Sequence, residues 1–147
     1  MQLPDSICVN RMFLHNRNIR SHWQLPMQTA DAIAECLIRK MFDTIDIRRW
    51  DDLGQCFTVD VVYERPGYEP LFGLDALDHF YRAVRIIASG EHQIERLIAC
   101  PDAAACWGRF VGADRNGRPL NERFSDVYEL RNGLVARRVT HFFRPAI

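Results

Sequence analysis

The order of its hydrophobic patterns is the feature of this chain that most restricts its fold. Apolar residues recur every four positions over Thr29–Asp46 and again over Asp75–Ala88, as they do on one face of a helix. A shorter helical pattern covers Arg48–Phe57. From His92 onward apolar and polar residues alternate, which is typical of half-buried strands. Helical patterns gathered early and strand patterns gathered late favour an α+β domain.

Five strands are predicted, separated by turns that contain glycine, proline or asparagine. They cover Val59–Glu64, His92–Ile98, Ala103–Val111, Leu120–Leu130 and Leu134–Phe143. We expect a cone-shaped, curved antiparallel sheet with the three N-terminal helices packed on its concave face, and a ligand pocket inside the cone. Three helices cannot also cover the outer face of such a sheet. We therefore expect that face to pair with a second copy of the chain, giving a homodimer.

Composition restricts the partners that the chain can bind. The 147 residues are 48% hydrophobic and 26% charged, with a formal net charge of zero, as in an ordinary globular domain. The charges form no basic cluster, so we expect no nucleic-acid partner. No stretch approaches the roughly 20 apolar residues of a membrane span, so we expect no membrane partner. The five cysteines have no metal-binding spacing, and reduced thiols of this kind indicate a cytoplasmic protein.

The first 26 residues differ from the rest of the chain. They contain three arginines, two histidines and two prolines, with little hydrophobic periodicity and no apolar core of a signal peptide. We predict a flexible N-terminal arm over residues 1–26, followed by one domain over residues 27–147. An organelle-targeting presequence is the alternative, because the segment carries arginines and few acids.

Asp126 is the strongest candidate for a functional residue, because it is a carboxylate on the apolar face of a predicted strand. Phe124, Tyr128 and Leu130 share that face by alternation. A buried carboxylate is costly unless it is hydrogen-bonded, paired or protonated, and a chain that keeps one usually has a use for it. The alternative is a structural aspartate bound to a backbone amide or an arginine. Arg109 is a candidate partner that would keep Asp126 ionised.

Several runs resemble the nuclear transport factor 2-like superfamily, and within it the ketosteroid isomerase and SnoaL-like polyketide cyclase branch. They are Phe57–Gly67, Phe80-Tyr81, Phe124–Val135 and Phe142–Pro145. The resemblance implies a cystatin-like or ketosteroid isomerase-like fold. It also implies a cofactor-free isomerase, cyclase or dehydratase acting on a hydrophobic carbonyl or polyketide-like small molecule. Because the superfamily hosts many activities, an epoxide hydrolase and a non-catalytic small-molecule-binding or assembly module remain alternatives.

The resemblance also implies roles for three residues. Glu64 stands where ketosteroid isomerases keep an aspartate as general base, and Asp126 matches their protonated, oxyanion-holding aspartate. His92 looks like the catalytic histidine of the scytalone dehydratase-like branch. The tyrosine that steroid isomerases keep on the first helix has no counterpart here, since Met41 or Phe42 occupies its place.

The chemistry that these residues support is removal of a proton α to a carbonyl, which needs a base near the carbon and a donor at the oxygen. We predict Glu64 as the base, Asp126 as the oxyanion donor or partner and His92 as the second proton carrier. The candidate substrate-binding residues are Tyr63, Tyr81, Trp107, Arg109, Tyr128 and Phe142. No cofactor is required, and no metal site is predicted, because the available His, Asp and Glu residues lack a recognisable spacing.

Each catalytic candidate also has a structural alternative. Glu64 lies next to Arg65 in the sequence and could form an ion pair at the end of its strand. His92 follows a Gly-Glu turn and could be exposed or purely structural. The direction of His141 is left open, because both faces of its strand are partly apolar.

Overall fold

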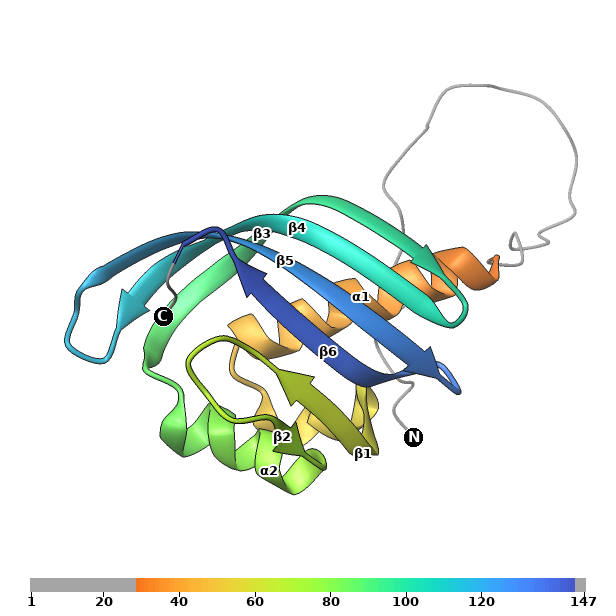
Figure 1. Cartoon of the computed structure of the whole chain (residues 1–147), viewed down its shortest axis with the longest axis horizontal. Coiled ribbons are helices and arrows are strands. Elements are labelled where there is room, and N and C mark those ends of the chain that lie inside the picture. The colour runs from red at the N-terminus through yellow and green to blue at the C-terminus, as the bar shows by residue number, and fades with distance from the viewer. Residues whose placement is uncertain (1–28, 145–147) are drawn as a thin grey trace, which may run out of the picture.

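The structure is a computed structural model that describes residues 29–144 of the chain (Figure 1). The predicted arm over residues 1–26 lies outside the described residues. The helical elements are α1 (Ala30–Asp46), the 3₁₀ turn η1 (Trp50–Gln55), α2 (Leu74–His79) and the π turn η2 (Phe80–Val84). The strands are β1 (Phe57–Glu64), β2 (Leu71–Phe72), β3 (Ile87–Cys100), β4 (Ala103–Asp114), β5 (Pro119–Arg131) and β6 (Leu134–Phe142).

The six strands form one sheet in the order β2-β1-β6-β5-β4-β3, which confirms the predicted α+β class. Neighbouring strands are antiparallel except for β1 and β6, which run parallel. β1 follows α1 and η1 in the chain and joins the sheet beside its last strand, β6, with which it runs parallel. The two-residue strand β2 was not predicted, since alternation cannot be recognised over so short a segment.

The sheet arches over α1, and α2 lies beside β1 and β2 at the end of the arch (Figure 1). α1 begins after Thr29, whose side chain accepts a hydrogen bond from the amide of Ala32. The helix buries an apolar stripe that includes Ile38, Met41 and Ile45, each at most 1% exposed. Burying each such side chain contributes about 1.5–3 kcal/mol, so this stripe holds α1 against the concave face.

The bend of the sheet depends on glycines in β3 and β4. A Cβ atom at Gly108 would lie 2.1 Å from the carbonyl oxygen of Gln93, and Gly90 has a φ of 152°. The β3–β4 register shifts twice, between Ile87 and Ser89 and between Ile94 and Arg96. Irregularities of this kind bend a strand and increase its twist.

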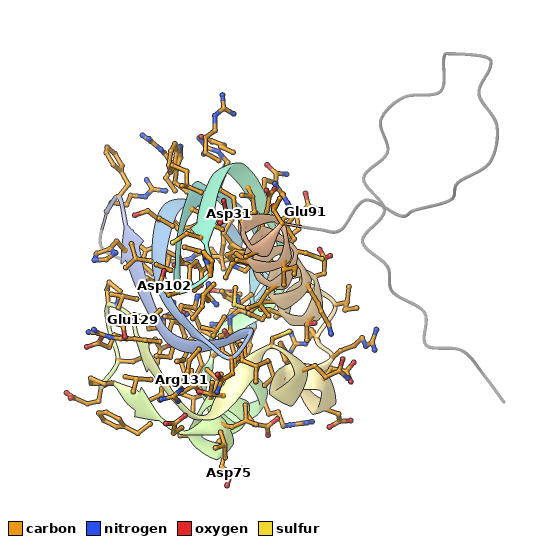
Figure 2. The ribbon with its side chains drawn as sticks, turned by 90° about the vertical axis from the view of Figure 1, so that its right-hand side faces the viewer. Asp31, Asp75, Glu91, Asp102, Glu129 and Arg131 are labelled. Carbon is orange, nitrogen blue, oxygen red and sulfur yellow. The ribbon has the colours of Figure 1, made fainter. Side chains whose placement is uncertain are left out.

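The predicted third helix ends earlier than its pattern indicates. Its second half is the π turn η2, which closes with a hydrogen bond from the amide of Arg85 to the carbonyl of Phe80, and β3 then begins at Ile87. This early end places Arg85 between a turn and a strand, at the wall of the interior. Charged side chains such as Asp75 and Glu129 point away from the ribbon into solvent (Figure 2). Within residues 29–144 no helix combines the length and apolar character needed to cross a membrane.

Candidate active site

A small cavity lies inside the cone, between the end of α1, η2 and the concave face of the sheet. Its volume is about 20 Å³, which is enough for about one water molecule. The polar side chains that line it are Tyr63, Arg65, Tyr81, Arg85, His92, Arg138 and Thr140. Most of the remaining lining is aromatic, from Phe110, Phe124 and Phe142. A substrate must therefore displace some of these side chains to enter.

His92 and Asp46 form a hydrogen-bonded pair at one wall of this cavity. The Nδ1 atom of His92 lies 2.5 Å from Oδ1 of Asp46, and the backbone amide of His92 donates to Oδ2 at 2.7 Å. The two side chains are 8% and 16% exposed. Because a carboxylate accepts hydrogen bonds, this contact places the imidazole proton on Nδ1 and leaves Nε2 with its lone pair.

Three phenylalanine rings surround the imidazole of His92. Its ring centroid lies 4.7 Å from that of Phe42, 4.9 Å from Phe110 and 5.3 Å from Phe124. Burial lowers the pKa of His92, and the opposing effect of Asp46 does not restore it. His92 is therefore neutral near pH 7 and can accept a proton.

Asp126 is fully buried and ion-paired with Arg138 on β6. Arg138 donates to Oδ2 of Asp126 from Nη2 at 2.6 Å and from Nε at 3.0 Å, and Tyr128 donates to the same oxygen at 2.9 Å. Burial and the nearby carboxylate raise the pKa of Tyr128 well above its usual value. In this arrangement Oδ2 of Asp126 accepts three hydrogen bonds, which favours the arginine-paired structural alternative over the protonated donor that the resemblance implied.

The guanidinium of Arg138 also holds the phenol of Tyr81. Nη1 of Arg138 donates to the Tyr81 hydroxyl at 3.1 Å, and the Tyr63 hydroxyl lies 3.2 Å from Oγ1 of Thr140. Burial raises the pKa of Tyr81 to about 12. At Tyr63 burial acts in the same direction, but the positive charges of Arg138 and Arg65 outweigh it and lower the pKa. Positive charge from two arginines therefore acts on the phenol of Tyr63.

Two further arginines reach the cavity and lie against aromatic rings. The guanidinium carbon of Arg65 is 5.3–5.5 Å from the ring centroids of Tyr68, Phe80 and Phe142. That of Arg85 is 5.4 Å from the ring centroid of Tyr81 and 5.7 Å from that of Phe110. Such cation–π contacts offset only part of the cost of burying an arginine.

The structure brings some of the predicted site residues together and separates others. His92, Tyr63, Tyr81 and Phe142 line the cavity, and Asp126 and Tyr128 lie directly behind Arg138. Glu64, Trp107 and Arg109 lie outside it.

Strand alternation explains the position of Glu64: Tyr63 points inward, so its neighbour points outward. There Glu64 accepts hydrogen bonds at 2.7 and 3.0 Å from Arg137, not from the neighbouring Arg65.

Trp107 and Arg109 point away from the cavity for the same reason. Both flank the inward-facing Gly108 on β4, and Trp107 is 41% exposed. Arg109 donates to Oδ1 of Asn121 at 2.7 Å, and its predicted pairing with Asp126 is taken by Arg138. His141, left open by its sequence pattern, is exposed and lies beside Ser125, which in turn pairs with Trp107.

Three residues at the cavity, Asp46, Arg85 and Arg138, were not among the predicted site residues. For Asp46 the signal is its place one helical turn after the buried Phe42, on the same face of α1. Arg138 alternates with Thr140 and Phe142 on β6, so its inward direction could have been read in the same way. Arg85 carried no such signal. Within residues 29–144 no three His, Cys, Asp or Glu side chains lie close enough together to hold a metal ion.

Comparison with known proteins supports the fold. The family model described as SnoaL-like domain matches residues 38–138. No protein with a curated function matches this chain at a significant level.

Three of the similar solved structures represent different activities. A proposed SnoaL-like polyketide cyclase from Jannaschia sp. CCS1 has a TM-score of 0.69 and 12% identity, over 81% of this chain and 91% of that one. A proposed ketosteroid isomerase from Kribbella flavida has a TM-score of 0.67 and 23% identity, over 81% and 84%. An LEH-like epoxide hydrolase from M. tuberculosis has a TM-score of 0.68 and 16% identity, over 78% and 85%. At these identities the likeness concerns the fold alone.

Proposed function

This chain belongs to the SnoaL-like domain family, and we propose that it is an acid–base enzyme in which His92, held by Asp46, removes a proton α to the carbonyl group of a small molecule. The observation that carries this proposal is the buried contact of 2.5 Å between Nδ1 of His92 and Asp46. A histidine whose one nitrogen is oriented by a carboxylate, and whose other nitrogen is free and basic, is suited to general base catalysis.

The proton transfer breaks one C–H bond of the substrate. The proton moves to Nε2 of His92, and the electron pair moves through the new C=C bond to the carbonyl oxygen, which becomes an enolate. Asp46 stabilises the imidazolium that forms. Arg138 and the hydroxyl of Tyr81 are donors that would stabilise the negative oxygen, because charge that develops in a dry, preorganised site is strongly stabilised.

The same first step serves isomerisation, aldol-type cyclisation and dehydration. In isomerisation the imidazolium of His92 returns the proton to a different carbon, and in dehydration it delivers the proton to a departing hydroxyl group. The cavity of about 20 Å³ favours a compact substrate over a multi-ring polyketide, since a large occupant would displace many buried side chains.

A non-catalytic binding module is the first alternative. Such a module would show Glu64 at the surface and Asp126 bound to an arginine. In the structure Glu64 is partly exposed and paired with Arg137, and Asp126 is bound to Arg138. The His92–Asp46 pair favours the enzyme, because a binding module does not require a buried imidazole whose Nδ1 is held by a carboxylate.

An epoxide hydrolase is the second alternative. It would hold a water molecule between two carboxylates with an arginine alongside. The cavity has the volume for one water molecule, and Arg138 lies beside Asp126. Asp46, the other nearby carboxylate, is engaged by both the ring and the amide of His92, which makes a shared water less favourable.

The test of the proposed function is exchange of α-protons for deuterium. Acetone, cyclohexanone and pyruvate are incubated with the protein in deuterated buffer and followed by proton NMR. We expect His92→Gln to reduce the exchange by about a hundredfold or more, as removal of a general base does. His79→Gln is the matched control, because His79 is exposed on α2. Equal rates for wild type and His92→Gln would reject His92 as the base.

We also propose that the outer face of the sheet forms a homodimer. Ile98, Trp107 and Val127 are 65%, 41% and 45% exposed there, and Ile98 and Val127 both flank Ala105 across β3, β4 and β5. Burying a patch of this kind against a second copy would remove apolar area from water. In size-exclusion chromatography with light scattering, we expect the mass of two chains for the wild type and one for Trp107→Glu. Ile33→Glu on α1 is the control, and a monomeric wild type would reject the dimer.

A further inference from the structure

Arg85 is a buried cation whose charge the described part of the chain does not balance. The residue is 7% exposed, and its Nε atom has no hydrogen-bond partner among the described residues. Arg138, in the same cavity, is neutralised by Asp126 at 2.6 Å. Among residues 29–144, no carboxylate pairs with Arg85, and its guanidinium lies against the ring faces of Tyr81 and Phe110. A buried charge without a counter-charge is costly, so its retention indicates an anionic ligand.

The position of Arg85 relative to the base indicates where that anion would lie. The ring of Phe110 lies against both groups: its centroid is 5.7 Å from the guanidinium carbon of Arg85 and 4.9 Å from the imidazole centroid of His92. Both side chains line the same cavity of about 20 Å³. An anionic group bound to Arg85 would therefore be only a few bonds away from an atom that His92 can reach.

We propose that the substrate of this site is a small oxo acid, whose carboxylate binds Arg85 while the carbon next to its carbonyl faces Nε2 of His92. The proposal rests on the proposed function, since it assigns a substrate class to the same base. A carboxylate is favoured over a phosphate because it is planar, matches the fork of a guanidinium with two parallel hydrogen bonds and displaces fewer side chains from a small cavity.

The electrostatics of the cavity agree with an anionic occupant. The pKa of Tyr63 is lowered although its phenol is buried, because the positive charges of Arg138 and Arg65 outweigh burial. Burial lowers the pKa of Arg85, yet an arginine remains charged at neutral pH. The cationic side chains of Arg85 and Arg138 thus both line this cavity.

Binding is tested by calorimetry on the full chain with three carboxylates and their neutral amides: acetate and acetamide, pyruvate and pyruvamide, benzoate and benzamide. We expect at least one carboxylate to bind about tenfold or more tightly than its amide. Arg85→Gln should weaken that carboxylate by about tenfold to a hundredfold, the range for a charge-assisted hydrogen bond, and leave the amide unchanged. Arg115→Gln, at an exposed arginine, is the matched control.

Thermal unfolding of the ligand-free protein is the second measurement. A ligand-binding Arg85 destabilises the empty site, so Arg85→Gln and Arg85→Met should melt at the same temperature as wild type or higher. A structural Arg85 would instead lower the melting temperature in both variants. That result would overturn the proposal, as would the absence of any carboxylate preference, or chloride or phosphate binding as tightly as the carboxylates.

The outcomes separate this proposal from the proposed function. Pyruvate that binds through Arg85 but undergoes no α-proton exchange would overturn the function of His92 and leave the anion site standing. Exchange on acetone without any preference for carboxylates would leave the base standing and overturn the oxo acid. Both measurements use the same protein, and pyruvate is the ligand common to both.

Discussion

Replacing Arg138 by methionine removes the only cation that lies on Asp126 in the described part of the chain. The carboxylate is 0% exposed and the arginine side chain 4%, so water cannot replace the two hydrogen bonds of 2.6 and 3.0 Å that are lost. Removing one partner of a buried ion pair costs about 3–5 kcal/mol. For a domain of this length, that loss lowers the melting temperature by roughly 10 °C or more.

The coupling between the two groups gives the decisive test. Asp126→Asn should destabilise the wild type, because it leaves the charge of Arg138 uncompensated. In the Arg138→Met background the same change should stabilise by about 1–2 kcal/mol, because it removes an unpaired buried charge. Urea denaturation followed by circular dichroism measures all four proteins. An equal cost of Asp126→Asn in both backgrounds would refute the reasoning, since it would mean that the two groups do not interact.

Three further predictions concern other parts of the molecule. Because the pKa of His92 is lowered from 6.5 on folding, its neutral form stabilises the fold above about pH 6.5, and that stability should be lost as the pH falls below this value; His92→Gln should remove this part of the pH dependence of unfolding. Glu64→Gln should leave α-proton exchange within about twofold of wild type and lower the free energy of unfolding by at most about 1 kcal/mol, because a half-exposed ion pair contributes little. Loss of exchange in this variant would show that Glu64 takes part in the reaction. Gly108→Ala should destabilise by about 3 kcal/mol or more in denaturant titrations, because its Cβ would overlap the carbonyl of Gln93, whereas Gly54→Ala, with its nearest contact at 3.5 Å, should cost less than about 1 kcal/mol.

Hydrophobic periodicity predicted most of the fold. The repeat in α1 and the alternation in β4 to β6 are long enough to distinguish helix from strand, and those elements lie close to where they were predicted. The prediction failed at the third helix, where an apolar repeat continued through Ile87 although the chain had already entered β3. It also missed β2, whose two residues are placed by pairing with β1.

The site was predicted less completely, because it combines residues that are distant in the chain. Strand alternation identified Asp126 as buried, and the resemblance identified His92. The partners of both residues lie far away in sequence: Asp46 is 46 positions from His92, and Arg138 reaches Asp126 from the neighbouring strand. Side chains alternate between the two faces of a strand, and this alternation correctly placed Asp126 in the interior. On β1 the same alternation places Glu64 on the outer face, because its neighbour Tyr63 faces the cavity.

The sequence by itself determined the order of helices and strands, the family and the presence of a carboxylate in the interior, because these follow from local periodicity and short runs of residues. Only the tertiary structure decided the arginine partner of that carboxylate, the carboxylate partner of the histidine and the position of Arg85 beside the cavity. These are properties of distances and solvent exclusion between groups from separate elements. They arise when the bent sheet closes over α1, and no local pattern records them.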